Sequence, residues 1–384
     1  MKVVHVTLRF DAPGGVETNV REIAKGLRAA GDDVSVFASD LYDEGRWERR
    51  TSFAPAVDGV PVRRFPVRKR VVPFLTMPMM GGLIDALAAQ PWDVIHAHSH
   101  RYGHVLQAAA VARRHRVPLV VSTHYHPADR GEKPLKRGLL RCQDVAFGMS
   151  AYRIADALVV ETEREAGLLR EFAPSKGIRV IPPGIDLDAW GHPDADAPPA
   201  GLPERFVLYA GRIAPNKGLP ILLQAFARLP KSGRPRLVLM GRDWGERPAL
   251  ERLAAELGVT DELLWLGHVE SPSEYRGVVR RASVFVLPSE WEAFGLVLLE
   301  AMAARVAIVA SAVGGVPEVL EGGKSGRLVP YGDPGALADS IGQLLADDAE
   351  RRRLVTAGTL RVASLTWANA VARHRALYRE LARG

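Results

Sequence analysis

Cysteine and long apolar runs are nearly absent from this chain. Its 384 residues include one cysteine, Cys142, which excludes an intrachain disulfide framework and a zinc site built from cysteines. No run of about 18 apolar residues free of charge occurs, so we expect no membrane-spanning helix. The first residues also lack the apolar stretch and small-residue cleavage site of a secretory signal. We therefore expect a cytoplasmic protein.

The composition is that of a globular protein, with 47% apolar and 25% charged residues. A chain of this length favours two domains of about 150–200 residues over a single core. The net charge is +7, and nearly all of the positive excess falls in residues 1–187. Such a field suits a phosphorylated ligand, an anionic membrane surface or a nucleic acid, and a solvated basic surface is the plain alternative.

Short apolar segments alternate with amphipathic helical segments in two successive runs, which predicts α/β domains with parallel sheets. Residues 191–203 separate the two runs, are rich in Pro, Ala and Asp, and are interpreted as a linker. We expect one domain over 1–190, a second over 204–366, and a helical stretch over 333–382 that breaks near 364–366. The expected strands begin at Val3, Val34, Val94, Leu119, Ala157 and Val180 in the first run, and at Phe206, Arg236, Leu263, Val284 and Ala307 in the second.

Two features of the first run lie where strands end. The loop Pro13-Gly14-Gly15 stands between a strand and a helix, where adjacent glycines let the backbone approach a phosphate, although a tight turn is the simpler interpretation. His124 follows the apolar strand 119–122, and we expect it to donate a hydrogen bond to a substrate. The neighbouring His-x-His pairs could form a metal site, but no carboxylate spacing supports one, and we predict none.

Two cations of the second run lie in one glycine-flanked loop. Arg212 and Lys217 stand between Gly211 and Gly218, directly after a strand and before a helix. Both could converge on one diphosphate, where two cations would stabilise the charge of a leaving group. An ordinary surface loop is the alternative.

Two carboxylates of the second run flank a helix start. Glu292 lies on the turn before the helix, and Glu300 lies on the helix itself. Eight helical residues advance about 12 Å, so one carboxylate can contact a sugar while the other contacts a ribose diol. The amides of residues 294–296 could meet phosphate oxygens between them. The alternative interpretation is a favourable helix-start acid for Glu292 and a solvated helix face for Glu300.

These residues together resemble those of the retaining, nucleotide-sugar-dependent glycosyltransferases of family four, which have the GT-B fold of two Rossmann-like domains. The resemblance covers essentially the whole chain. It is carried by Pro-Gly-Gly-Val-Glu at 13–17, Ser-Thr-His at 122–124, Gly-Arg-x4-Lys-Gly at 211–218, Glu-x7-Glu at 292–300, Gly-Gly-Val-Pro-Glu at 314–318 and Gly-Arg-Leu-Val at 326–329.

The resemblance implies roles for single residues and a metal-independent reaction without a cofactor. The catalytic set would be His124, Arg212, Lys217 and Glu292, with Glu300 on the ribose and Arg212 and Lys217 on the diphosphate in place of a metal. Configuration at the transferred carbon would be retained, and residues 367–384 would return to the first domain. The donor site would comprise Gly14, Gly15, Arg212, Lys217, Val269, Glu292, Phe294, Gly295, Leu296 and Glu300.

The expected reaction moves a hexosyl unit from a UDP- or GDP-sugar to a hydroxyl acceptor. A lipid, a saccharide or a small molecule could be the acceptor, and we expect no nucleic-acid partner. Residues 63–80 join a basic run to apolar residues, as a site for an anionic membrane surface would. A nucleotide-sugar 2-epimerase and a non-catalytic sugar-nucleotide-binding protein of the same fold are the alternatives.

Overall fold

The computed structural model describes residues 1–11, 14–43, 47–72, 75–127, 134–171, 173, 177–193 and 196–383. Its backbone contacts divide the chain into two compact units. Unit 1 comprises Met1–Pro183 and Trp367–Gly384, and unit 2 comprises Gly184–Thr366. Each unit has its own cores, and each is described by itself. Within the described ranges no helix is both long enough and apolar enough to span a bilayer.

Unit 1 is built on an eight-stranded sheet in the order β12-β11-β10-β9-β1-β2-β6-β5. All neighbours pair in parallel except β5 and β6, so the expectation of a parallel α/β sheet is confirmed. Its strands are β1 (Lys2–Thr7), β2 (Asp33–Ser39), β5 (Ala56–Val57), β6 (Val60–Phe65), β9 (Val94–His98), β10 (Leu119–Ser122), β11 (Ala157–Val160) and β12 (Ile178–Val180).

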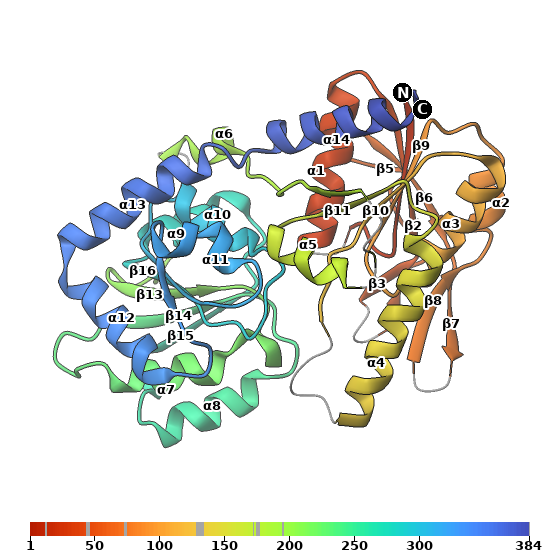
Figure 1. Cartoon of the computed structure of the whole chain (residues 1–384). Coiled ribbons are helices and arrows are strands. Elements are labelled where there is room, and N and C mark those ends of the chain that lie inside the picture. Colours follow the sequence, from red (N-terminus) through yellow and green to blue (C-terminus); the bar gives the residue numbers. More distant parts are fainter. Residues whose placement is uncertain are drawn as a thin grey trace. The chain divides into compact units, whose positions relative to one another are not determined.

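Helices cover the sheet of unit 1 (Figure 1), and two further pairs of strands in this unit are antiparallel. One pair comprises residues 67–72 and 75–80 of the basic and apolar stretch, and its register runs from Val67 opposite Met80 to Val72 opposite Leu75. The remaining elements are α1 (Gly15–Ala29), α2 (Leu83–Ala88), α3 (Gly103–His115), α4 (Pro134–Phe147), a π-helix (Gly148–Tyr152), α5 (Glu163–Arg170), α14 (Trp367–Leu381), β3 (Leu41–Asp43), β4 (Glu48–Arg49), β7 (Val67–Val72) and β8 (Leu75–Met80).

The C-terminal helix α14 is part of unit 1 because it packs along α1 (Figure 1). The contact is close: a Cβ atom on Gly26 would lie 2.4 Å from Val371 Cγ2. Tyr378 is fully buried, and Arg375 Nε donates to Asp32 Oδ2 at 2.8 Å. Residues that are distant in sequence therefore complete the core beneath the first strands.

Unit 2 is built on a six-stranded parallel sheet in the order β15-β14-β13-β16-β17-β18. Its strands are β13 (Phe206–Ala210), β14 (Arg236–Met240), β15 (Leu263–Gly267), β16 (Val284–Leu287), β17 (Ile308–Ser311) and β18 (Arg327–Val329). Its helices are α6 (Leu187–Trp190), α7 (Leu219–Arg228), α8 (Arg247–Glu256), α9 (Pro272–Arg281), α10 (Leu296–Ala303), α11 (Val316–Val319), α12 (Pro334–Ala346) and α13 (Asp348–Val362), with short 3₁₀ turns at Pro215–Lys217, Thr260–Glu262 and Glu321–Gly323.

The division between the units falls at Gly184, earlier than the linker interpreted at 191–203. The described part of that segment packs on α9 instead of spanning between units. The side chain of Asp196 is fully buried and accepts hydrogen bonds from Arg276 and Arg280, both at 2.8 Å. A buried carboxylate with two guanidinium partners fixes the segment to unit 2, although its composition is that of a flexible linker.

The helical stretch expected over 333–382 has one break more than the sequence predicts. Besides the break before Trp367, α12 ends at Ala346 and α13 begins at Asp348. The side chain of Asp347 accepts from the amides of Ala349 and Glu350, both at 2.9 Å, and so caps the second helix.

Candidate active site

In unit 2, Lys217 and Glu292 form an ion pair at the carboxyl ends of two adjacent strands. Lys217 follows β13 and Glu292 follows β16, and Lys217 Nζ lies 2.6 Å from Glu292 Oε1. Ser289 Oγ donates to the same oxygen at 2.6 Å. The two charged side chains are 12% and 13% exposed, so each is held but reachable. The sequence predicts separate roles for the two residues, and the structure brings them together.

The backbone that packs against Glu292 requires glycine at position 314. Gly314 has φ +52°, and a Cβ atom on it would lie 1.8 Å from the carbonyl oxygen of Glu292. The amide of Gly315 donates to that same oxygen at 3.0 Å. The Gly-Gly segment therefore permits close backbone approach, and this contact fixes the turn that carries Glu292.

Arg212 lies in the loop after β13, with its guanidinium carbon 4.6 Å from the centre of the Trp244 ring. Its carbonyl oxygen accepts from Tyr209 Oη at 2.6 Å. Burial raises the pKa of Tyr209; the charge of Glu292 adds to this and that of Arg212 opposes it. Both charges therefore act on the same buried phenol at the end of β13.

Glu300 lies on α10 and accepts a hydrogen bond from Tyr275 Oη of α9. Burial raises the pKa of Glu300, and the bond from Tyr275 acts in the opposite direction. Phe294, Gly295 and Leu296 lie at the start of α10, where amides have no partner within the helix. In the sequence, these helix-start amides lie between the two carboxylates, Glu292 and Glu300.

Val269 lies in the loop after β15 and packs partly buried against the apolar core that contains Phe294. The predicted donor residues of unit 2 thus all follow strands of one sheet at its carboxyl edge, where open parallel sheets bind ligands.

In unit 1, Gly14 and Gly15 lie where α1 begins, after β1; Pro13 of the same loop lies outside the described residues. A Cβ atom on Gly14 would lie 2.1 Å from Glu17 Oε2. Glu17 in turn pairs with Arg9 at 2.8 Å. The helix start therefore has a paired acid beside its free amides.

His124 follows β10, as predicted, and its side chain is 7% exposed. Its Nδ1 lies 3.0 Å from Glu161 Oε1, in the segment after β11. Burial alone lowers the pKa of His124, but the hydrogen bond and charge of Glu161, aided by Glu165 and Glu17, raise it above its ordinary value. The protonated ring is thereby favoured.

Backbone strain marks the same edge of unit 1. Ser99, Arg101 and His124 are not glycines, yet their φ angles are +81°, +66° and +43°. Arg101 is held by Asp144, which also accepts from His100 Nε2 at 2.8 Å. Such strain persists where surrounding contacts over-determine it, and it clusters at functional sites.

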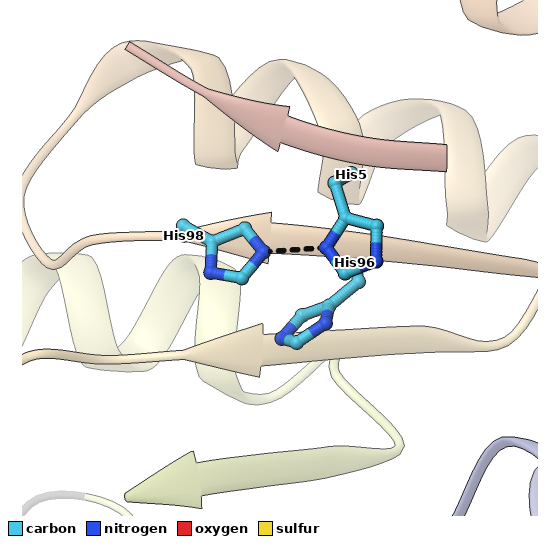
Figure 2. A group of neighbouring side chains, drawn as sticks. All are labelled: His5, His96 and His98. Atoms are coloured by element: carbon cyan, nitrogen blue, oxygen red, sulfur yellow. Dashed lines mark hydrogen bonds between the residues drawn. The ribbon is translucent and has the colours of Figure 1, made fainter. Parts of the chain in front are cut away.

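Three histidines cross the interior of unit 1 on neighbouring strands, with ring nitrogens within 4.8 Å of one another (Figure 2). His5 Nδ1 lies 2.9 Å from His98 Nε2, which is a hydrogen-bond distance. His96 is engaged at both nitrogens, by Tyr378 Oη at 2.5 Å and Ser122 Oγ at 2.8 Å. Burial and the charge of His374 lower the pKa of His5 to about 3. These contacts describe a hydrogen-bonded network of neutral rings.

Sequence reasoning missed Glu161, Glu165, Tyr275, Trp244 and Asp144. Tyr275 contacts Glu300 of α10 and the other four contact residues near strand ends, in each case from a distant part of the chain; Glu161, for example, lies 37 residues after His124. The one local signal was position, because Glu161 directly follows the apolar strand β11 and Trp244 closely follows β14. A charged or aromatic residue at a strand's carboxyl end is a general indication of a site.

Comparisons with known proteins agree across both units. The pattern of the family described as glycosyl transferases group 1 matches residues 195–361, and that of the glycosyl transferase 4-like domain matches residues 14–184. A D-inositol 3-phosphate glycosyltransferase of Xylanimonas cellulosilytica is 34% identical over 94% of this chain and 90% of its own. One of Mycolicibacterium smegmatis is 34% identical over 93% and 84%.

Solved structures show the same fold. Sucrose-phosphate synthase of Thermosynechococcus elongatus has a TM-score of 0.77 and 26% identity over 99% of both chains. Anabaena HepE, solved in complex with UDP, has a TM-score of 0.75 and 19% identity, covering 99% of this chain and 100% of its own. The chain has the GT-B fold and belongs to the group 1, family 4-type glycosyltransferases.

Proposed function

We propose that this glycosyltransferase moves a hexosyl unit from a UDP- or GDP-sugar to a hydroxyl acceptor, with retention of configuration and without a metal. The observation that carries the proposal is the set of charges at the carboxyl edge of the unit 2 sheet. There Glu300 is held by Tyr275, and Lys217 is paired with Glu292. This edge supplies a carboxylate for the ribose diol and cations for a diphosphate.

In the proposed reaction the bond between the sugar carbon and the diphosphate oxygen breaks, and a bond from that carbon to the acceptor oxygen forms. The proton of the acceptor hydroxyl passes to the leaving diphosphate. Arg212 and Lys217 stabilise the charge on that diphosphate, which is the work a metal would otherwise do. Glu292 and the amides at the start of α10 hold the hydroxyls of the sugar.

Binding of the diphosphate rearranges the ion pair. Lys217 is bound to Glu292 at 2.6 Å, and an incoming phosphate offers Lys217 a second anionic partner. Glu292 then becomes free to accept from sugar hydroxyls, while Ser289 continues to donate to it. The phosphate thus replaces Glu292 as the partner of Lys217, and the sugar hydroxyls replace Lys217 as partners of Glu292. Neither charge is therefore buried without a partner.

For the acceptor we propose a phosphorylated polyol, with D-inositol 3-phosphate as the first compound to test. Relatives that are 31–34% identical carry that acceptor in their names. The positive excess in residues 1–187 suits a phosphorylated acceptor bound to unit 1.

A lipid-borne acceptor is the second candidate. Helix α4 exposes Leu135 at 79% and Val145 at 44%, together with Arg141, as a surface in contact with anionic lipid would. Co-sedimentation with anionic vesicles at low salt tests it, and absence of binding eliminates it.

The donor is tested by thermal shift with UDP, GDP, ADP, CDP and NAD on the wild type and on Glu300→Ala. A nucleotide at 100 times its dissociation constant adds about 2.7 kcal/mol of stability. We expect this stabilisation with UDP or GDP and its loss in Glu300→Ala. Stabilisation by NAD alone, or by no nucleotide, contradicts the donor site.

Turnover separates the classes of function. We expect release of UDP or GDP that depends on the acceptor and continues in EDTA. Conversion of the sugar nucleotide without acceptor would identify an epimerase, and binding without turnover would identify a sugar-nucleotide-binding protein. Dependence on added divalent metal would overturn the metal-independent mechanism.

A further inference from the structure

A buried carboxylate holds the loop of unit 1 that carries His124. Glu165 of α5 accepts from Thr123 Oγ1 at 2.5 Å, from the amide of Tyr125 at 2.7 Å and from the amide of Glu161 at 2.9 Å. The residues on both sides of His124 and the backbone of Glu161 therefore share one anchor. Three hydrogen bonds to one buried carboxylate make this anchor rigid.

A second carboxylate orients the ring itself. Glu161 Oε1 lies 3.0 Å from His124 Nδ1 and also accepts from Asn19 Nδ2 of α1 at 3.2 Å. An ionised carboxylate has no hydrogen to donate, so Nδ1 must carry the proton of this bond. Nε2 of His124 is buried and has no hydrogen-bond partner within the described part of the chain. Since an unpaired buried nitrogen is unfavourable, Nε2 is the atom left for a ligand.

We propose that Glu161 is a positioning residue that holds the Nδ1–H of His124 against its own carboxylate and thereby fixes Nε2 as the ring atom that bonds a substrate oxygen. This inference rests on the proposed function, because it assigns the substrate to the carboxyl edge of β10. The strained backbone at His124, with φ +43°, is part of the same device, since the Glu165 anchor keeps the loop in that conformation.

The charges around the ring favour the donor form. Three carboxylates raise the pKa of His124 against the effect of burial, and only the protonated ring donates through both nitrogens. Other histidines of the network have lowered pKa values and stay neutral. The titratable groups that face the ring are Glu17 of α1 with its partner Arg9, Glu161 and Glu165 beside and within α5, His96 and His98 of β9, and His374 of α14.

Two variants separate the charge of Glu161 from its geometry. Glu161→Gln keeps an oxygen that accepts from Nδ1 and removes the charge, whereas Glu161→Ala removes both. We expect the alkaline limb of kcat/KM to move about one pH unit lower in Glu161→Gln, at the small end of what a neighbouring opposite charge produces. At pH values well above that limb, kcat/KM of Glu161→Gln is then about tenfold lower than that of the wild type. In Glu161→Ala we expect an additional loss at every pH.

Selective ¹³C labelling of the histidine rings provides a readout other than activity. The His124 resonance is assigned by its absence in His124→Asn, and we expect its titration to move to lower pH in Glu161→Gln. Glu163→Gln is the matched control, because Glu163 lies two residues away on α5 with its side chain 69% exposed. We expect Glu163→Gln to change neither the titration of His124 nor the alkaline limb of kcat/KM.

The outcomes distinguish this inference from the proposed function. An unchanged titration of His124 in Glu161→Gln, or an unchanged pH limb, overturns the positioning role even if transfer is normal. If the wild type transfers no sugar from UDP- or GDP-sugars, the proposed function fails, while the titration still decides whether Glu161 sets the state of His124.

Discussion

The two sheets place their polar side chains differently. In unit 2 the central strands β13 and β16 are wholly buried and almost entirely apolar, and charged groups occur where strands end. In unit 1 the central strands β1 and β9 carry His5, His96 and His98 in their interior. Unit 2 holds two of the eleven histidines, His192 and His268, and both are exposed.

This difference separates two ways of building a strand-end site. In unit 2 the charges lie beyond the ends of apolar strands, so we expect that the core and the site can be altered independently. In unit 1, polar side chains extend from the site through the core to α14. The ring of His124 stacks on that of His98 at 5.9 Å, and His96 bonds Tyr378 of α14. Its stability therefore depends on protonation and on the C-terminal helix.

Acidification should destabilise unit 1 at a higher pH than unit 2. Burial lowers the pKa of His5 to about 3, and of His104 and His374 to about 4. Their folded values lie below 6.5, so the stability they contribute is complete above pH 6.5 and is lost as the pH falls toward the folded values. Each pH unit below 6.5 costs about 1.4 kcal/mol for a histidine kept neutral in the fold, so we expect acidification to pH 4.5 to destabilise unit 1 strongly.

Peptide-resolved hydrogen exchange measures the acid destabilisation of each unit, once the exchange rates are corrected for the pH dependence of intrinsic amide exchange. We expect unit 1 to lose protection between pH 6.5 and 4.5 while unit 2 keeps it. Simultaneous loss in both units would show that the histidines do not govern acid stability.

Removal of the Tyr378 side chain should destabilise unit 1 next most strongly. Tyr378→Ala empties a fully buried site and leaves His96 Nδ1 without its partner, at a cost of about 3–5 kcal/mol in the free energy of unfolding. Tyr378→Phe keeps the packing and should cost about 1–3 kcal/mol. Urea denaturation measures both. Equal costs for the two variants would mean that the hydrogen bond, and not the packing, dominates.

Lys217→Ala should affect catalysis and leave the fold intact. Loss of one cation at the leaving diphosphate lowers kcat about 10²–10³-fold. Lys231→Ala, an exposed lysine of the same unit, is the control and should retain full activity. Steady-state kinetics and melting temperature are measured together. A drop in melting temperature large enough to account for the lost activity would contradict a role in transfer.

Tyr275→Phe should have the smallest effect. Glu300 loses its hydrogen bond from Tyr275, which weakens nucleotide binding by about 1 kcal/mol, or roughly fivefold. Calorimetric titration with UDP or GDP and their 2′-deoxy analogues measures the change, with Tyr331→Phe as an exposed control. The effect should shrink with the analogues, and an identical loss for both would place Tyr275 away from ribose recognition.

Much of the fold and part of the candidate site could be predicted from the sequence. The alternation of apolar strands and amphipathic helices predicts both parallel sheets, and the strand before His124 places that residue at a carboxyl edge. The composition of residues 191–203 does not reveal that Asp196 bonds two arginines on α9, because they lie 80 and 84 residues later. The pairing of Lys217 with Glu292 was also missed, since 75 residues separate them.

The amino-acid sequence by itself determined the element types, the glycines at tight turns and the residues placed at strand ends, because these depend on periodicity and on backbone freedom within a few residues. The tertiary structure decided the partners: Glu161 for His124, Tyr275 for Glu300, and Tyr378 for His96. Such partners set orientation and protonation, and they arise only when the sheets and helices bring distant segments within hydrogen-bond range.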